Sequence, residues 1–140
     1  MPVPMEYRLA SQNFDRFLAE VAEATGLATR NQAYTTTQAV LQAFRRRLDT
    51  AQAIAFAQVL PAMLRALFVM DWDPQEPRVT GWDRAAMTEE VKQLRIDHNF
   101  SPASAIADVA RVLRAYVDAA AFARCLATLP PEARAIWAVQ

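Results

Sequence analysis

The feature that most constrains how this chain folds is an internal repeat. Shifting the 140-residue sequence by 69 positions aligns residues 40–68 with residues 109–137 without a gap and gives eight identities. The alignment runs across a turn and across Leu60-Pro61, which matches Leu129-Pro130. Such a match indicates a tandem duplication, in which two copies of one supersecondary unit pack together to bury their apolar faces.

Each copy is predicted to be helical. Alanine, the best helix former, occupies 29 positions, whereas glycine occupies two. Phe14, Phe17, Leu18 and Val21 recur at the spacing of one helix face, and no run of β-branched residues alternates with a period of two. We therefore predict an all-α fold, a compact bundle of about six to eight helices built from a duplicated unit of three to four helices.

Turn-forming residues divide the chain into two parts. We expect one globular domain, residues 1–140, in which repeats 11–70 and 80–140 are joined by a linker, residues 71–81. The linker contains two prolines, one glycine and three acidic residues, which disfavour a continuous helix. In the second repeat, Ser101-Pro102 is typical of a helix start, with serine as the N-cap and proline in the first turn.

An aspartate and an arginine recur around the proline corner in both repeats. Asp49 and Arg65 in the first repeat align with Asp118 and Arg134 in the second. One hypothesis is that each pair is structural. In this hypothesis, a charge-assisted hydrogen bond joins the short helix after each Leu-Pro corner to the preceding turn.

Several core positions resemble a known family. They are Phe17-Leu18-x-x-Val21, Gly26-Leu27, Ala39-Val40-Leu41 with Arg47-Leu48, Leu60-Pro61 and Trp72. This pattern resembles the bacterial domain of unknown function 2267 family over nearly the whole chain. In the first helix of the second repeat, Ala85-Ala86-Met87 stands where the pattern has a Phe-Leu pair. The resemblance implies a helical fold and a bacterial source, and it implies no activity.

The charge balance and the cysteine content limit the classes of partner. Fifteen basic and fifteen acidic residues give a net charge of zero, which favours neither nucleic acid nor an anionic membrane as a partner. We expect no signal peptide and no membrane span, because no sufficiently long apolar run is present. The single cysteine, Cys125, excludes an internal disulfide and indicates a cytoplasmic protein with a buried, inert thiol.

Two clusters are candidates for a binding surface. Arg45-Arg46-Arg47 lies near a helix C-terminus, where cations are favoured, and we interpret it as a solvated face. The alternative is contact with phosphates in a helix-turn-helix-like arrangement, or with a protein partner. Trp72 lies in the linker and Trp82 directly follows it, and these two side chains either seal the edge of the core or form an aromatic interaction surface.

The remaining polar candidates are weaker. His98 is the only histidine, and a surface loop position is favoured over a catalytic or sensing role. Asp71, Asp73 and Glu76 carry oxygen ligands for a hard cation, but Pro74 sits among them and favours a solvated linker. The sequence contains no catalytic, cofactor-binding or metal-binding motif that we identify.

The leading functional hypothesis is a non-enzymatic protein-interaction or regulatory module that binds an unidentified protein partner or a second copy of itself. The alternative is a nucleic-acid-binding regulator that uses Arg45–Arg47. An enzyme would need a deep pocket with convergent polar groups, and no cofactor or metal is predicted. The two repeats share their scaffold residues, so we expect a binding surface where the repeats differ.

Overall fold

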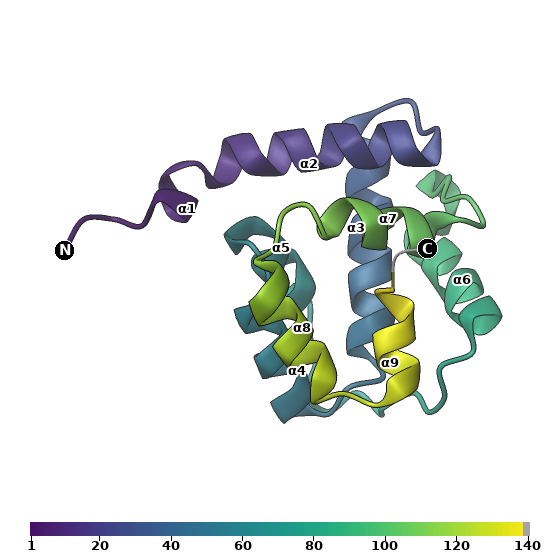
Figure 1. Cartoon of the computed structure of the whole chain (residues 1–140). Coiled ribbons are helices and arrows are strands. Elements are labelled where there is room, and N and C mark those ends of the chain that lie inside the picture. Colours follow the sequence, from purple (N-terminus) through teal and green to yellow (C-terminus); the bar gives the residue numbers. More distant parts are fainter. Residues whose placement is uncertain (139–140) are drawn as a thin grey trace.

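The computed structural model describes residues 1–138 of the chain, and every regular element in this part is helical (Figure 1). The α-helices and the short 3-10 helix η1 are α1 (Met5–Arg8), α2 (Ala10–Thr25), α3 (Arg30–Arg45), α4 (Thr50–Gln58), α5 (Ala62–Val69), α6 (Arg84–Gln93), η1 (Ile96–His98), α7 (Ala105–Leu113), α8 (Ala119–Ala127) and α9 (Pro131–Ile136). The predicted all-α class is confirmed. The described residues form nine α-helices, more than the predicted six to eight. The additional one, α1, is a single turn, too short to show an apolar period.

The boundary between α2 and α3 follows from local chemistry. Gly26 ends α2 in the left-handed conformation, with φ at 73°, and its N–H donates to the carbonyl of Ala22. Glycine adopts this conformation without a Cβ penalty. Thr29 then begins α3, because its hydroxyl accepts a hydrogen bond from the Gln32 N–H at 3.1 Å.

The start of α7 differs from its prediction. The helix begins at Ala105 instead of directly after Ser101. Ser101 is buried, and its hydroxyl lies 2.7 Å from the hydroxyl of Thr36 on α3. Because the serine side chain is satisfied inside the protein, it does not cap the helix.

Helix α3 lies at the centre of the fold and packs against α2, α5, α6 and α7. Figure 1 shows α2 lying across one end of α3, with α1 and the N-terminal tail extending beyond the other helices. Among residues 1–138, no helix is both long enough and apolar enough to cross a membrane.

Aromatic side chains from both repeats share one core. The ring of Phe56 lies 4.7 Å from Phe44 and 5.8 Å from Phe122, between ring centroids. The Trp137 ring lies 5.2 Å from Phe44, and all four side chains are fully buried. Large aromatic side chains contribute strongly to core stability, so this cluster holds the C-terminal helices against α3 and α4.

Two arginines at matching repeat positions make equivalent hydrogen bonds. Arg45 Nη1 donates to the carbonyl of Phe68 at 2.8 Å. Arg114 Nε donates to the carbonyl of Trp137, also at 2.8 Å. Shifting the first donor and acceptor by 69 positions gives the second pair. In each of the two aligned segments, an arginine therefore holds the end of the short helix after the Leu-Pro corner, which is α5 or α9.

Candidate functional site

The arginine triplet is mostly internal, which corrects the prediction of a solvated face. Arg45 and Arg47 are 3% and 4% exposed, and only Arg46 is partly open to solvent. Besides Phe68, Arg45 donates to the carbonyl of Met70 at 3.0 Å. Burial lowers the pKa of Arg45, and the adjacent charge of Arg46 lowers it further. The two carbonyl oxygens replace part of the water that this cation loses on burial, while its Nε atom is buried without a hydrogen-bond partner.

The other two arginines share one acidic partner on α6. Arg46 Nη1 and Arg47 Nη2 each donate to a different carboxylate oxygen of Glu90, both at 2.9 Å. Arg47 also donates to the carbonyls of Ala43 and Gly81, so its guanidinium group joins α3, α6 and the end of the linker. The triplet is therefore bound within the protein and is not free to meet phosphate groups as a set.

The aspartates and arginines of the proline corner have other partners than the sequence hypothesis gives them. Asp49 caps α4 by accepting from the Gln52 N–H at 2.7 Å. Arg65 donates to the carbonyls of Ala57 at 2.9 Å and Leu60 at 3.0 Å. The Asp49 carboxylate and the Arg65 guanidinium therefore each bind a backbone group in place of the predicted Asp–Arg bond.

The second repeat makes the same two contacts. Asp118 caps α8 by accepting from the Ala121 N–H at 2.9 Å. Arg134 Nη1 donates to the carbonyl of Leu129 at 2.9 Å, which matches the bond from Arg65 to Leu60. All four predicted residues are thus structural in their contacts, as helix caps and as donors to the corner carbonyls.

The two tryptophans beside the linker are half-buried against the core. Trp82 lies 5.4 Å from Phe44 between ring centroids. The guanidinium carbon of Arg45 lies 5.6 Å over the ring of Trp72, a cation–π distance. Both rings therefore pack largely inward, and they do not form a joint exposed aromatic surface.

The two remaining candidates from the sequence, His98 and Cys125, lie in different environments. His98 is exposed on η1 and lines an open groove with Tyr34, Arg95 and Phe100. Cys125 is 8% exposed on α8, and burial raises the pKa of its thiol.

The linker acids Asp71, Asp73 and Glu76 are exposed. Glu76 pairs with Arg46 at 3.4 Å, and Asp73 accepts from the Gln75 N–H. Within residues 1–138, no three His, Cys, Asp or Glu side chains gather as a metal site would require.

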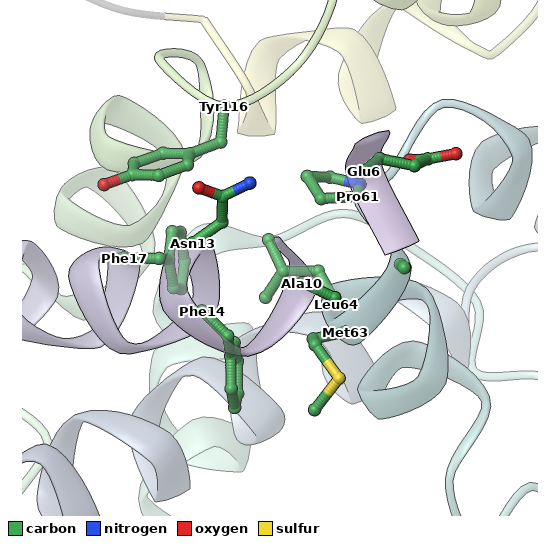
Figure 2. A pocket seen from close by; sticks show the side chains of 10 residues that line it. Glu6, Ala10, Asn13, Phe14, Phe17, Pro61, Met63, Leu64 and Tyr116 are labelled. Atoms are coloured by element: carbon green, nitrogen blue, oxygen red, sulfur yellow. The ribbon is translucent and has the colours of Figure 1, made fainter. Parts of the chain in front are cut away.

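A cavity that the sequence analysis did not predict lies beneath α1 and the start of α2. Figure 2 shows Phe14 and Phe17 of α2 on one side, Met63 and Leu64 of α5 on another, and Tyr116 across from them. The cavity volume is about 30 Å³ and most of its lining is apolar. That volume accommodates the end of one apolar side chain or one or two water molecules.

A more polar groove continues from this cavity. The two hollows share Glu6, Asn13, Pro61 and Tyr116, and the second extends toward Asp118 at the start of α8. We call the two together the Tyr116 groove. Its walls come from α1 and α2, from the Leu60-Pro61 corner, and from the turn before α8.

Tyr116 is held firmly in this groove. Its ring packs edge to face on Phe17, with centroids 5.5 Å apart. Burial, together with the hydrogen bond and the negative charge of Glu20, raises the pKa of Tyr116 to about 12. The hydroxyl therefore stays protonated and acts as a donor at neutral pH.

Exposed apolar side chains gather next to the groove. Residues 1–9, which we call the apolar arm, include α1, which buries no residue. The arm carries half of the large apolar side chains that are exposed in the structure, namely Met1, Val3, Met5, Tyr7 and Leu9.

The sequence contained a signal for the arm, but none for the groove. Apolar residues at alternate positions from Val3 to Leu9 precede the first predicted helix, and they fit neither a strand in a sheet nor a signal peptide. The groove joins residues from α2, α5 and the turn before α8, so only the tertiary fold reveals it.

Comparisons with known proteins are consistent with this architecture. A search of curated proteins finds no match to the chain. The family described as "Uncharacterized conserved protein (DUF2267)" matches residues 14–136, nearly the whole chain. The predicted family resemblance is confirmed, and the chain belongs to the DUF2267 family.

Proposed function

We propose that this protein is a non-enzymatic interaction module that associates with a second copy of itself through the apolar arm and the Tyr116 groove. One observation carries the proposal. Exposed apolar side chains are concentrated in residues 1–9, whose helix α1 buries no residue, beside a cavity whose lining is mostly apolar. Removing such surface from water is favourable, at roughly 25 cal/mol per Å².

A second copy is the occupant that the features of the chain favour. Glu6 of the arm lines the groove of its own molecule, so the arm and the groove are adjacent, and a two-fold axis would let each arm enter the groove of the other copy. The net charge of zero places no long-range repulsion between two copies. The groove accepts the tip of one apolar side chain, such as Met5 or Leu9.

Sedimentation velocity over a range of concentrations tests the proposal. The wild-type chain is expected to shift toward a dimer as the concentration rises. The double variant Met5→Gln/Leu9→Gln is expected to remain monomeric, and Met63→Lys, which places a charge in the groove, is expected to do the same. Circular dichroism establishes that each variant is folded.

A matched control uses two other exposed apolar residues. Ile54 and Val69 are 54% and 41% exposed and do not line the groove. The variant Ile54→Gln/Val69→Gln is expected to dimerise like the wild type. A wild-type chain that stays monomeric, or an arm variant that dimerises normally, rejects self-association through this surface.

The nucleic-acid alternative is not carried forward. It depends on Arg45, Arg46 and Arg47 as free cations, and these side chains are bound to backbone carbonyls and to Glu90 and Glu76. A gel shift at low salt provides the direct test, since phosphate binding is strongest there. A shift that disappears when Arg46 is neutralised would restore the alternative.

We also propose that residues 11–70 and 80–140 arose by tandem duplication within a single domain. The support is the matched contacts, in which Arg45 and Arg114, Arg65 and Arg134, and Asp49 and Asp118 bind equivalent backbone groups. A sequence profile of the first repeat from many family members should detect the second repeat at the same offset, and its failure would reject the duplication.

We infer that this protein is located in the bacterial cytoplasm. The single cysteine, Cys125, is buried and unpaired among the described residues, which fits a reducing compartment. Localising a tagged copy in the source cell tests this inference, and a periplasmic or extracellular location would reject it.

A further inference from the structure

Met70 lies at the end of α5, where the chain turns into the connection to α6. Its side chain is half-buried against the core. Two donors from α3 face its sulfur atom, the Tyr34 hydroxyl at 3.7 Å and Gln38 Nε2 at 3.5 Å. These two side chains are one helical turn apart, so they approach the sulfur from the same face of α3.

The sulfur atom is a poor partner for these donors. A thioether accepts hydrogen bonds only weakly, and Gln38 is 2% exposed, so water cannot replace the missing interaction. The Gln38 Oε1 atom is also buried without a hydrogen-bond partner. A buried amide that is poorly satisfied destabilises the fold, which makes this a place where an added acceptor atom is favourable.

The backbone of Met70 is fixed independently of its side chain. Its carbonyl accepts hydrogen bonds from Gln42 Nε2 at 3.3 Å and from Arg45 Nη1 at 3.0 Å. A chemical change at the sulfur therefore leaves the end of α5 anchored to α3.

We propose that Met70 is a methionine-oxidation site whose sulfoxide oxygen is bound by Tyr34 and Gln38. The oxidant is a peroxide such as hydrogen peroxide. Its O–O bond breaks, one oxygen atom forms a bond to the sulfur, and the other leaves as water. The sulfur loses two electrons and the peroxide gains them. A sulfoxide oxygen is a strong acceptor, so both donors gain a better partner than the thioether.

The other methionines lack this arrangement. Met1, Met5 and Met63 are exposed, so an oxygen atom added to any of them is open to solvent. Met87 is fully buried in the core, where an added polar atom is excluded. Met70 differs from all of these because the structure already supplies donors for the oxidised product.

The first test oxidises the full-length chain with hydrogen peroxide in a Met5→Leu/Met63→Leu background. Peptide mapping by mass spectrometry is expected to find oxygen on Met70 and none on Met87 while the protein is folded. The midpoint of thermal unfolding is expected to be unchanged or higher after oxidation. In the same background with Tyr34→Phe, oxidation is expected to lower the midpoint by several degrees.

A second test needs no oxidant and covers the case in which oxidation is incomplete. The carbonyl oxygen of a glutamine side chain is placed much like the oxygen of a methionine sulfoxide. We expect Met70→Gln to be at least as stable as Met70→Leu, and we expect this advantage to disappear when Tyr34→Phe is added.

Two results would overturn the proposal, and neither depends on self-association. One is a Met70 that stays reduced until the protein unfolds. The other is a loss of stability on oxidation, or on Met70→Gln, that is the same with and without the Tyr34 hydroxyl.

Discussion

Arg47 and Glu90 form an ion pair that joins the turn after α3 to α6, and the arginine side of this pair is almost closed to solvent. Arg47 Nη2 lies 2.9 Å from Glu90 Oε2, and the two side chains are 3% and 23% exposed. Helix α6 is the first helix after the linker, so this pair ties the segment that follows the linker to the turn at the end of the central helix α3.

Replacing Glu90 is predicted to destabilise the protein markedly. The change Glu90→Ala leaves a buried guanidinium group without its counter-charge, which costs about 2–3 kcal/mol of the free energy of unfolding. The loss is below that of a fully buried pair because Arg47 keeps its bonds to Ala43 and Gly81. Urea unfolding followed by circular dichroism measures it.

The neighbouring residue provides the control for this prediction. Glu89 has a side chain that is 71% exposed and pairs only with Lys92, at 3.6 Å. Because exposed ion pairs contribute little, Glu89→Ala should change the stability by less than about 0.5 kcal/mol. Equal effects from the two substitutions would show that the Arg47–Glu90 bond has no special role.

The helix cap at Asp49 and the corner contacts of Arg65 are predicted to act independently. Asp49→Ala removes the cap of α4 and should cost about 1 kcal/mol. Arg65→Ala removes the donors to Ala57 and Leu60 and should cost about 1–2 kcal/mol. The double variant should equal the sum within about 0.5 kcal/mol, as measured by urea unfolding. A larger interaction energy would restore the direct Asp49–Arg65 pairing that the sequence suggested.

The helix boundaries and buried positions that can be predicted from the sequence are those determined by residues close together in the chain. Gly26 ends α2 and Thr29 begins α3, and each of these boundaries depends on residues within one helical turn. Phe17, Leu18 and Val21 are buried as the apolar stripe indicates. In these cases the residues that determine the helix end or the buried face lie close together in the sequence.

The environment of the arginine triplet is determined by residues far away in the sequence. Arg45 is buried because the carbonyls of Phe68 and Met70 reach it, and Arg47 is buried because Glu90 does. The sequence of the three arginines is the same whether or not such distant partners are present, so the sequence alone does not predict their burial. The Tyr116 groove escapes sequence reasoning for the same reason, since its walls meet only in the tertiary structure.

The ionisation of Tyr116 is predicted to weaken the fold at high pH. Its pKa is raised to about 12 in the folded protein, above the ordinary value of 10.0. Since the unfolded chain loses this proton first, the stabilisation is complete below pH 10 and is lost as the pH rises through about 12. The free energy of unfolding should therefore fall more steeply between pH 10 and pH 12 in the wild type than in Tyr116→Phe. Urea titrations at several pH values compare the slopes, and equal slopes would contradict the shifted pKa.

The thiol of Cys125 is predicted to be unreactive in the folded protein. Burial raises its pKa, and the residue is 8% exposed, so both the thiolate fraction and the access of a reagent are reduced. At pH 8, the aromatic disulfide reagent DTNB should label the native chain at least about tenfold more slowly than the urea-unfolded chain. The unfolded chain is the control, because it contains the same single thiol without its surroundings. Labelling at the same rate in both states would mean that α8 opens readily and that Cys125 is available for chemistry.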